Sequence, residues 1–305
     1  MKITVLIENK HNCEKALPGE HGLSIYIEYK GKKILLDAGA TDLFSQNADL
    51  LGVPLEMTDF SVLSHAHYDH SGGFEKFFEK NLKAVLYMQS SCRENCWRLL
   101  DRLHAKKTAA DDNVRYSKGK TEEISQEHLK YIGIPSGMLK RCKDRIRFVS
   151  GDCLLFPGAW LIAHHSSRLW EKGREAGMLR LENGRYCYDD FSHEQSLVFE
   201  TKQGLVIFNS CCHAGPDMIV NEVQARPCFN GQKVDALIGG FHLKDMPQNE
   251  QGSAFVKALG KRLAATGIAR FFTGHCTGDW AFEILAGILN ERLCYLKTGD
   301  EYEWA

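Results

Sequence analysis

The fold can be inferred from one stretch, Ser64-His65-Ala66-His67-Tyr68-Asp69-His70-Ser71-Gly72-Gly73. Four potential metal ligands lie within six consecutive residues of this stretch, 65–70. The apolar segment 59–63 before them is typical of a buried strand, and segment 74–78 after the glycines begins a helix. Imidazole and carboxylate groups suit zinc, iron or manganese. The stretch therefore predicts a metal site at the end of a strand.

The spacing of these residues predicts two neighbouring ions. His65 and His67 are two positions apart, so in an extended segment they point the same way and can share one metal. Asp69 and His70 follow where the chain turns and can face a second metal. Two ions about 3.5–4 Å apart can activate a water and stabilise the leaving oxygen of a phosphoester. The alternative is a group of histidines that serve only local hydrogen bonds.

The composition is that of a soluble globular protein. The chain has 305 residues, 44% hydrophobic and 25% charged, which suffices for a large core in one domain of two layered halves or in two domains. The net charge of −1 argues against a nucleic-acid binder. Residues 1–10 alternate like a strand rather than a signal peptide, and no segment approaches the ~20 apolar residues of a membrane span. We expect a cytoplasmic protein that does not bind membranes.

The chain contains eleven cysteines. Without an export signal we expect them to be reduced thiols rather than a disulfide framework. The sequence has no Cys-x-x-Cys pair, which argues against a zinc ribbon or an iron–sulfur cluster.

Three later strands also end in a histidine. Residues 205–208 lead to His213, residues 234–238 lead through two glycines to His242, and residues 270–273 lead to His275. Two β-sheets with helices outside them would bring such strand ends to one edge. We therefore predict an α/β (α+β) fold, an αββα sandwich of two mixed sheets flanked by helices.

One region does not fit the alternation of strands and helices. Residues 90–105 predict a helix with Cys92, Cys96 and Leu99 on one face, and the chain then becomes polar and basic up to Arg147. We interpret residues 1–305 as a single domain with a helical or irregular insertion at about 90–147. The basic residues are either a solvated surface or a lid that meets an anionic substrate.

The sequence resembles the metallo-β-lactamase fold superfamily over almost its whole length. Within it, the chain is most similar to the branch named 7,8-dihydropterin-6-yl-methyl-4-(β-D-ribofuranosyl)aminobenzene 5′-phosphate synthase. The resemblance is carried by the His-rich stretch and by six further segments: Glu20-His21-Gly22-Leu23-Ser24, Leu35-Leu36-Asp37-Ala38-Gly39, His193-Glu194-Gln195-Ser196-Leu197, Cys211-Cys212-His213-Ala214-Gly215, Gly239-Gly240-Phe241-His242-Leu243 and Gly274-His275-Cys276-Thr277-Gly278. It is specific for the fold and the metal site and much less so for the substrate.

The resemblance implies a ligand set for each of two divalent ions. These sets are His65, His67 and His213 for the first ion, and Asp69, His70 and His275 for the second. Zinc is favoured, with manganese or iron as alternatives. The resemblance also implies that Asp37 lies beneath the site and orients it, whereas from the residues alone Asp37 could equally be a turn or cap residue.

Two positions leave the ligand set open. Many members carry a bridging aspartate where this chain has Cys211 and Cys212, so either a thiolate ligates or a water alone bridges the ions. His193 is a rival to His213 as third ligand of the first ion, because it precedes the segment where other members carry that histidine. We favour His213.

The leading functional hypothesis is a dinuclear metal-dependent hydrolase. A metal-bound hydroxide would attack a phosphoester or a related anionic small molecule, with Asp69 and His242 as catalytic residues. His242 follows two glycines, where the backbone can approach a ligand closely, so we expect it to contact substrate or to protonate the leaving group. The alternatives are a pterin-dependent transferase, as the branch name implies, and an iron-dependent redox protein on the same scaffold.

Overall fold

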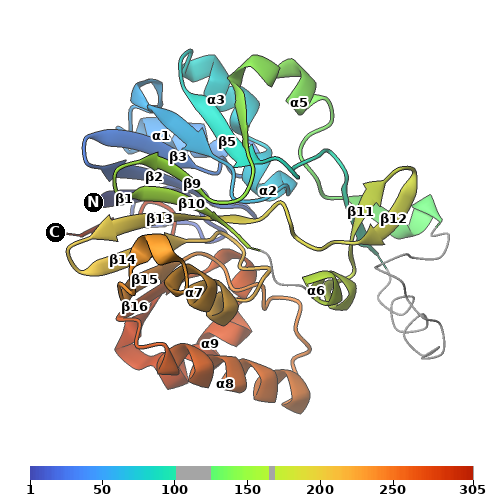
Figure 1. Cartoon of the computed structure of the whole chain (residues 1–305), viewed down its shortest axis with the longest axis vertical. Coiled ribbons are helices and arrows are strands. Elements are labelled where there is room, and N and C mark those ends of the chain that lie inside the picture. Colours follow the sequence, from blue (N-terminus) through green and yellow to red (C-terminus); the bar gives the residue numbers. More distant parts are fainter. Residues whose placement is uncertain (101–124, 165–168, 305) are drawn as a thin grey trace.

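Two seven-stranded sheets lie face to face at the centre of the molecule, with helices on both outer sides (Figure 1). The computed structural model describes residues 1–100, 125–164 and 169–304. This arrangement confirms the predicted αββα sandwich. The first sheet has the order β18 (Glu301–Glu303), β1 (Lys2–Ile7), β2 (Ser24–Tyr29), β3 (Lys32–Leu36), β4 (Phe60–Val62), β5 (Val85–Gln89) and β8 (Ile146–Val149).

The second sheet is also mixed. Its order is β17 (Leu293–Tyr295), β16 (Arg270–Thr273), β15 (Val234–Ile238), β14 (Gly204–Phe208), β13 (Gln195–Thr201), β10 (Ala159–Ala163) and β9 (Cys153–Phe156). The pairs β3–β4, β4–β5 and β5–β8 are parallel in the first sheet, and β14–β15, β15–β16 and β16–β17 in the second. Parallel neighbours end at the same edge, so the segments after β4, β14, β15 and β16 gather there.

The helices divide between the outer faces of the two sheets. In Figure 1, α1 (Leu43–Leu50), α3 (Phe74–Lys80) and α5 (Met138–Arg141) lie beside the first sheet, and α7 (Pro216–Gln224), α8 (Glu250–Ala265) and α9 (Asp279–Leu289) beside the second. The short α2 (Tyr68–Ser71) follows the His-rich stretch, and α6 (Leu169–Ala176) lies near the small sheet described below. Single 3₁₀ turns complete the chain: η1 (Leu55–Met57), η2 (Gln126–His128), η3 (Lys143–Arg145), η4 (Pro227–Phe229), η5 (His275–Thr277) and η6 (Asn290–Arg292).

The strands are apolar on both faces because both faces are covered. In β14, Val206 and Phe208 pack between the sheets, while Leu205 and Ile207 belong to the layer beneath the helices. This explains why the central strands read as continuous apolar runs rather than as alternating ones. The resulting core holds the strand ends in fixed positions.

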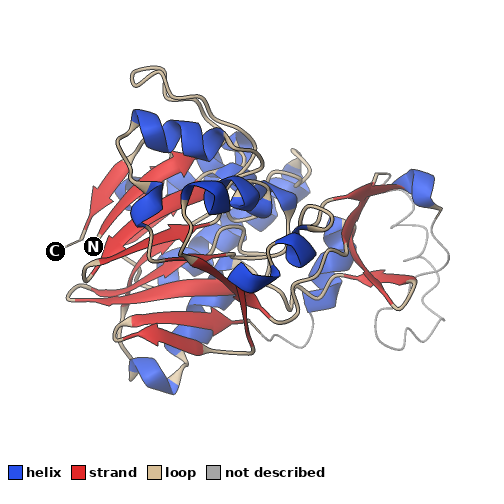
Figure 2. Ribbon diagram, turned by 90° about the horizontal axis from the view of Figure 1, so that it is seen from above, coloured by secondary structure: helices blue, strands red, loops and turns tan. Residues whose placement is uncertain are grey.

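A third, four-stranded sheet stands beside the sandwich (Figures 1 and 2). Its order is β12 (Arg185–Tyr188), β11 (Met178–Glu182), β6 (Cys96–Leu99) and β7 (Leu129–Tyr131). The helix predicted over 90–105 is therefore wrong where the structure describes it. Cys96 and Leu99 are both buried, but they lie in a strand and belong to two different hydrophobic clusters. The strand forms because β6 pairs with β11, a partner some eighty residues away that local periodicity does not reveal.

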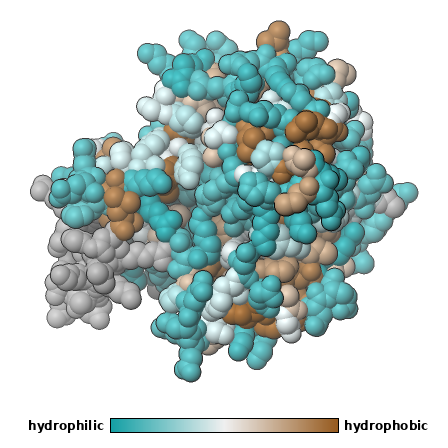
Figure 3. Space-filling model, turned by 180° about the vertical axis from the view of Figure 1, so that it is seen from behind, coloured by the Kyte–Doolittle hydropathy of each residue, from teal (hydrophilic) through white to brown (hydrophobic). Residues whose placement is uncertain are grey.

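Among the described residues, no helix is both long and apolar enough to cross a membrane. The face shown in Figure 3 is largely hydrophilic and carries separate hydrophobic areas.

Candidate metal centre

Four strand ends deliver histidines to one edge of the sandwich. The stretch after β4 carries His65 to His70, and β14, β15 and β16 are followed by His213, His242 and His275. The ring centroids of His65 and His213 are 4.9 Å apart, and those of His70 and His275 are 5.0 Å apart. The edge predicted from the strand pattern thus exists in the structure.

The Nε2 atoms of His70 and His275 face each other. The Nδ1–H of His70 donates to Asp37 Oδ2 at 2.8 Å, and that of His275 donates to Asn9 Oδ1 at 3.0 Å. In the neutral form of each ring, Nε2 then carries a lone pair, and the two Nε2 atoms are 3.2 Å apart. A cation between them would relieve their repulsion, and a separation of about 3.3 Å is what two nitrogens at about 2.0–2.1 Å from one tetrahedral zinc would show.

Two further donors approach the same point. Cys211 Sγ lies 3.2 Å from His70 Nε2, and Asp69 Oδ2 lies 3.8 Å from that nitrogen and 3.5 Å from His275 Nε2. The set of two imidazoles, a carboxylate and a thiol fits a divalent ion such as zinc.

A second group of donors lies beside the first. One ligand atom each of His65, Cys211 and His213 falls within 4.8 Å of the others, and the ring of His67 is 4.6 Å from that of His65 and 5.0 Å from that of His213. Among the described residues, Nε2 of His65, Nε2 of His67 and both ring nitrogens of His213 are buried without a hydrogen-bond partner. Buried nitrogens left unpaired are costly in a protein without a ligand, so this group also fits a metal ion.

Asp37 orients both groups from beneath. Its carboxylate accepts hydrogen bonds from the Ser64 N–H at 2.7 Å and the Ser64 hydroxyl at 2.6 Å, in addition to the His70 bond. Because the Ser64 hydroxyl donates to Asp37, it must accept from His65 Nδ1, 2.8 Å away. Asp37 thereby turns the Nε2 lone pairs of both His65 and His70 toward the site.

Other buried carboxylates hold the remaining backbone segments. Glu194 accepts from the N–H groups of His213 and Ala214 at 2.7 and 3.0 Å, and Glu8 accepts from the N–H of His275. Sequence reasoning missed Glu8, as it missed Asn9. The N-terminal strand gives no local sign that its end meets residue 275.

The backbone is strained at the site. Asp37, Cys212, His242 and His275 all have positive φ, between 46° and 56°, although none is glycine. Such conformations cost of order 1–3 kcal/mol and persist where the surrounding structure enforces them. Their concentration at these strand ends supports a functional use of this edge.

Burial favours the neutral form of four histidines at this edge in the metal-free protein. Burial lowers the pKa of His65 and His213 well below the ordinary value and lowers the pKa of His67 and His275 to about 3. Neutral imidazole is the form that binds metals.

His70 and Asp69 differ because each has charged neighbours. Burial works against the charged form of His70, but the carboxylates of Asp69 and Asp37 outweigh it and raise the pKa of that imidazole. Burial alone would raise the pKa of Asp69, yet His70, His21 and His275 hold it well below its usual range. Asp69 is thus a carboxylate, as a ligand must be.

A cavity of about 660 Å³ opens onto these groups. His67, Asp69, His213 and His242 line it, together with three cationic residues: Arg98, Lys130 and Lys244. Arg98 and Lys130 are cross-strand partners in β6 and β7. Arg98 is already paired with Asp245 at 2.7 Å, so the positive charge that suits the cavity to a negatively charged molecule comes from Lys130 and Lys244.

For the basic residues before Arg147 that the structure describes, the contacts favour a surface over a lid. Arg141 pairs with Glu75 at 2.6 Å, and Arg145 donates to the Ala84 carbonyl oxygen at 2.8 Å. Neither lines the cavity. Lys118 and Lys120, which belong to the same basic segment of the sequence, fall outside the described residues.

His242 lines two cavities. It lines the large cavity and also a smaller one of about 150 Å³, and its ring centroid is 4.4 Å from that of His213. Its Nδ1 is buried, with no hydrogen-bond partner among the described residues. His242 therefore has an unpaired ring nitrogen next to the donor groups, although it belongs to none of the described groups of three or more donors that could hold a metal ion.

Comparison with known proteins supports the fold and the family. A sequence profile of the metallo-beta-lactamase superfamily matches residues 17–129. The chain is 30% identical over 285 residues to the 7,8-dihydropterin-6-methyl-4-(beta-D-ribofuranosyl)-aminobenzene-5'-phosphate synthase of Methanocaldococcus jannaschii, an alignment that covers 91% of this chain and 88% of that protein.

Solved structures show the same fold. Tm1679, a metal-dependent hydrolase of the beta-lactamase superfamily, superposes with a TM-score of 0.76 at 23% identity, covering 100% of this chain and 99% of that one. Zn²⁺-bound PqqB from Methylobacterium extorquens has a TM-score of 0.55 at 10% identity, with 100% of each chain covered.

Proposed function

The chain belongs to the metallo-beta-lactamase superfamily, and from this premise we propose that it is a dinuclear metal-dependent hydrolase acting on a phosphoester or a related anionic small molecule. The observation that carries the proposal is the pair of facing Nε2 atoms of His70 and His275, beside a second group of buried nitrogens without described partners. Two adjacent sets of vacant donors favour two ions.

The residues would share the ions as follows. His65, His67 and His213 would hold the first ion, and Asp69, His70 and His275 the second. Cys211 lies within reach of both sets, which supports a thiolate ligand where an aspartate is common. Burial raises the pKa of the Cys211 thiol, so its ionisation would depend on the ions. Bound divalent ions would supply an activated water and stabilise negative charge on the substrate.

The chain's own groups would do the rest. Lys130 and Lys244 would bind the anionic part of the substrate in the cavity. His242, with its free Nδ1, would contact the substrate or donate a proton to the leaving oxygen.

The first test is hydrolysis of bis(p-nitrophenyl) phosphate by protein reconstituted separately with zinc, manganese or iron(II), with His65→Ala as control. We expect metal-dependent turnover that the variant lacks. Absence of turnover with every metal at full occupancy would contradict the hydrolase proposal. His242→Ala should lower turnover while the metal content stays unchanged, and loss of metal in that variant would make His242 a ligand instead.

A transferase is the second candidate, because the Methanocaldococcus jannaschii relative is named as a synthase. In that case the same site would bind a phosphate-bearing substrate and assist bond formation to a pterin. Product analysis with a dihydropterin and an aminobenzene ribotide separates the two candidates.

A further inference from the structure

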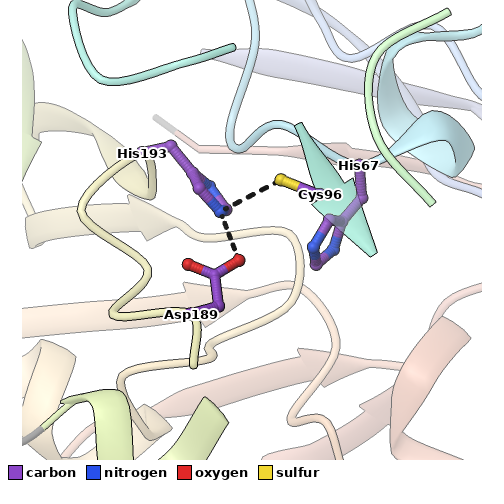
Figure 4. Close-up of side chains that lie close together, drawn as sticks. All are labelled: His67, Cys96, Asp189 and His193. Atoms are coloured by element: carbon purple, nitrogen blue, oxygen red, sulfur yellow. Dashed lines mark hydrogen bonds and ion pairs between the residues drawn. The ribbon is translucent and has the colours of Figure 1, made fainter. Parts of the chain in front are cut away.

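A second cluster of potential ligands lies behind the His-rich stretch. One donor atom each of His67, Cys96, Asp189 and His193 falls within 4.8 Å of the others, and all four residues are buried (Figure 4). His193 Nε2 is 3.8 Å from Cys96 Sγ and 3.1 Å from Asp189 Oδ2. By donor type alone, this cluster would pass for a zinc site.

The hydrogen bonds of His193 argue against that interpretation. The Ala66 N–H donates to His193 Nδ1 at 3.2 Å, so the ring proton is on Nε2, which donates to Asp189. His193 therefore has no free lone pair for a metal. Asp189 is also satisfied, because its other oxygen accepts from the Phe191 N–H at 2.8 Å and lies 3.5 Å from the Arg180 guanidinium.

The cluster is not a catalytic triad either. A general base between a thiol and a carboxylate needs one of them at each ring nitrogen. Here Cys96 and Asp189 both approach Nε2, while Nδ1 is taken by the backbone.

The hydrogen bond from the Ala66 N–H to His193 fixes the backbone between two proposed ligands, His65 and His67. Ala66 is fully buried between His65 and His67, so its N–H needs a partner, and the ring of His193 provides one. Asp189 fixes the tautomer that makes the ring an acceptor at that position.

The next two residues hold other parts of the same site. The Gln195 N–H donates to the Ser64 carbonyl oxygen at 2.9 Å, and the Gln195 side chain donates to the Leu63 carbonyl oxygen at 2.8 Å. Glu194 holds the backbone of His213, as described above. Three consecutive residues thus fix both chain segments that would supply the first ion.

We propose that His193-Glu194-Gln195 is a positioning segment, and that His193 acts by holding the Ala66 peptide rather than by binding a metal. The inference rests on the proposed metal site. It assigns a purpose to the His-Glu-Gln motif, which the ligand sets leave without a role. Outer-shell residues of this kind typically change metal affinity by about 10- to 100-fold.

Two substitutions of His193 separate the roles. In His193→Asn the side-chain oxygen can occupy the place of Nδ1 and accept from Ala66, but nothing replaces Nε2. In His193→Ala both the acceptor at Nδ1 and the donor at Nε2 are lost. We expect His193→Ala to bind the first ion about 10- to 100-fold more weakly at unchanged stoichiometry, and excess metal to restore its turnover. His193→Asn should remain within a few-fold of the wild type.

Cys96→Ser is the matched control, because Cys96 touches His193 Nε2 but holds no part of the His-rich stretch. Zinc affinity and stoichiometry are measured by chelator competition, and cobalt(II) spectra report the ligand set. If both His193 variants and Cys96→Ser each lose an ion, the cluster is a metal site and the inference is wrong. If His193→Ala binds zinc like the wild type, the positioning role is wrong.

Two further outcomes are distinguishable. Circular dichroism of the metal-free variants establishes folding, and if His193→Ala does not fold, loss of an ion in His193→Asn would overturn the inference while retention would support it. If the wild type itself binds no divalent metal, the proposed function fails, and the positioning role fails with it.

Discussion

Two buried histidine clusters lie close to the His-rich stretch, and they differ in how their ring nitrogens are used. In the cavity cluster, defined as His65, His67, His70, Cys211, His213 and His275, ring nitrogens are unpaired or face one another. In the His193 cluster, defined as Cys96, Asp189 and His193, both ring nitrogens of the histidine are satisfied. Residue type and burial are alike in the two. The comparison teaches that vacant lone pairs, rather than a gathering of donors, distinguish a metal site from a structural network.

The largest expected effect comes from the cavity cluster. Removing His213 should delete a ligand whose two nitrogens have no other described partner. We expect His213→Ala to lower zinc affinity by more than about 100-fold, beyond the range usual for outer-shell residues, and to abolish turnover. Metal analysis after dialysis checks this. An unchanged metal stoichiometry would mean that another residue is the third ligand of the first ion. Unpaired ring nitrogens would then not distinguish the two clusters.

Acidification should destabilise the metal-free protein through the same cluster. Burial depresses the pKa of His65, His67, His213 and His275, so below about pH 6.5 the unfolded chain binds more protons than the folded one. The free energy of unfolding therefore decreases as the pH falls below that value, by about 1.4 kcal/mol per pH unit for each such imidazole. His70, whose pKa is raised, offsets part of the loss.

Urea unfolding with a chelator between about pH 7.5 and about pH 5 measures this slope. His65→Ala removes one of the imidazoles and should flatten it. A slope of opposite sign would mean that these histidines are protonated in the folded protein.

The thiols of the two clusters should differ in the cobalt(II) protein. Cys211 lies among vacant donors, whereas Cys96 lies against a satisfied histidine. We expect a thiolate-to-cobalt charge-transfer band that Cys211→Ser loses and Cys96→Ser keeps. If Cys211→Ser retains the band and Cys276→Ser loses it, the ligand is the neighbouring thiol, whose Sγ is 3.4 Å from that of Cys211.

The smallest effect should come from removing a positive charge that lines the cavity. Lys130 is exposed and lines the cavity opposite Arg98, while Lys140 lies on α5 and does not line it. We expect Lys130→Gln to raise KM for an anionic substrate by about three- to fivefold with little change in kcat, and Lys140→Gln to leave both unchanged. Equal effects of the two would make the cavity charge irrelevant to binding.

Much of the fold was predictable from local pattern. The apolar strands, the glycines and the histidines after β4, β14, β15 and β16 are signals within a few residues of one another, and each strand end was placed correctly. Strand β6 was not, because Cys96 and Leu99 fit a helix face as well as a strand, and the choice depends on pairing with β11. The cations Arg98 and Lys130 became cavity residues only through that small sheet.

The sequence by itself determined the superfamily, the sandwich and the set of histidines near the metal edge, because these follow from residue type and short-range periodicity. Only the tertiary structure shows that the surroundings of His213 and His193 differ. That distinction depends on whether distant groups occupy the ring nitrogens: the Ala66 N–H and Asp189 occupy those of His193, whereas nothing described occupies those of His213. Hydrogen-bond satisfaction is decided by neighbours in space, and local sequence carries no record of them.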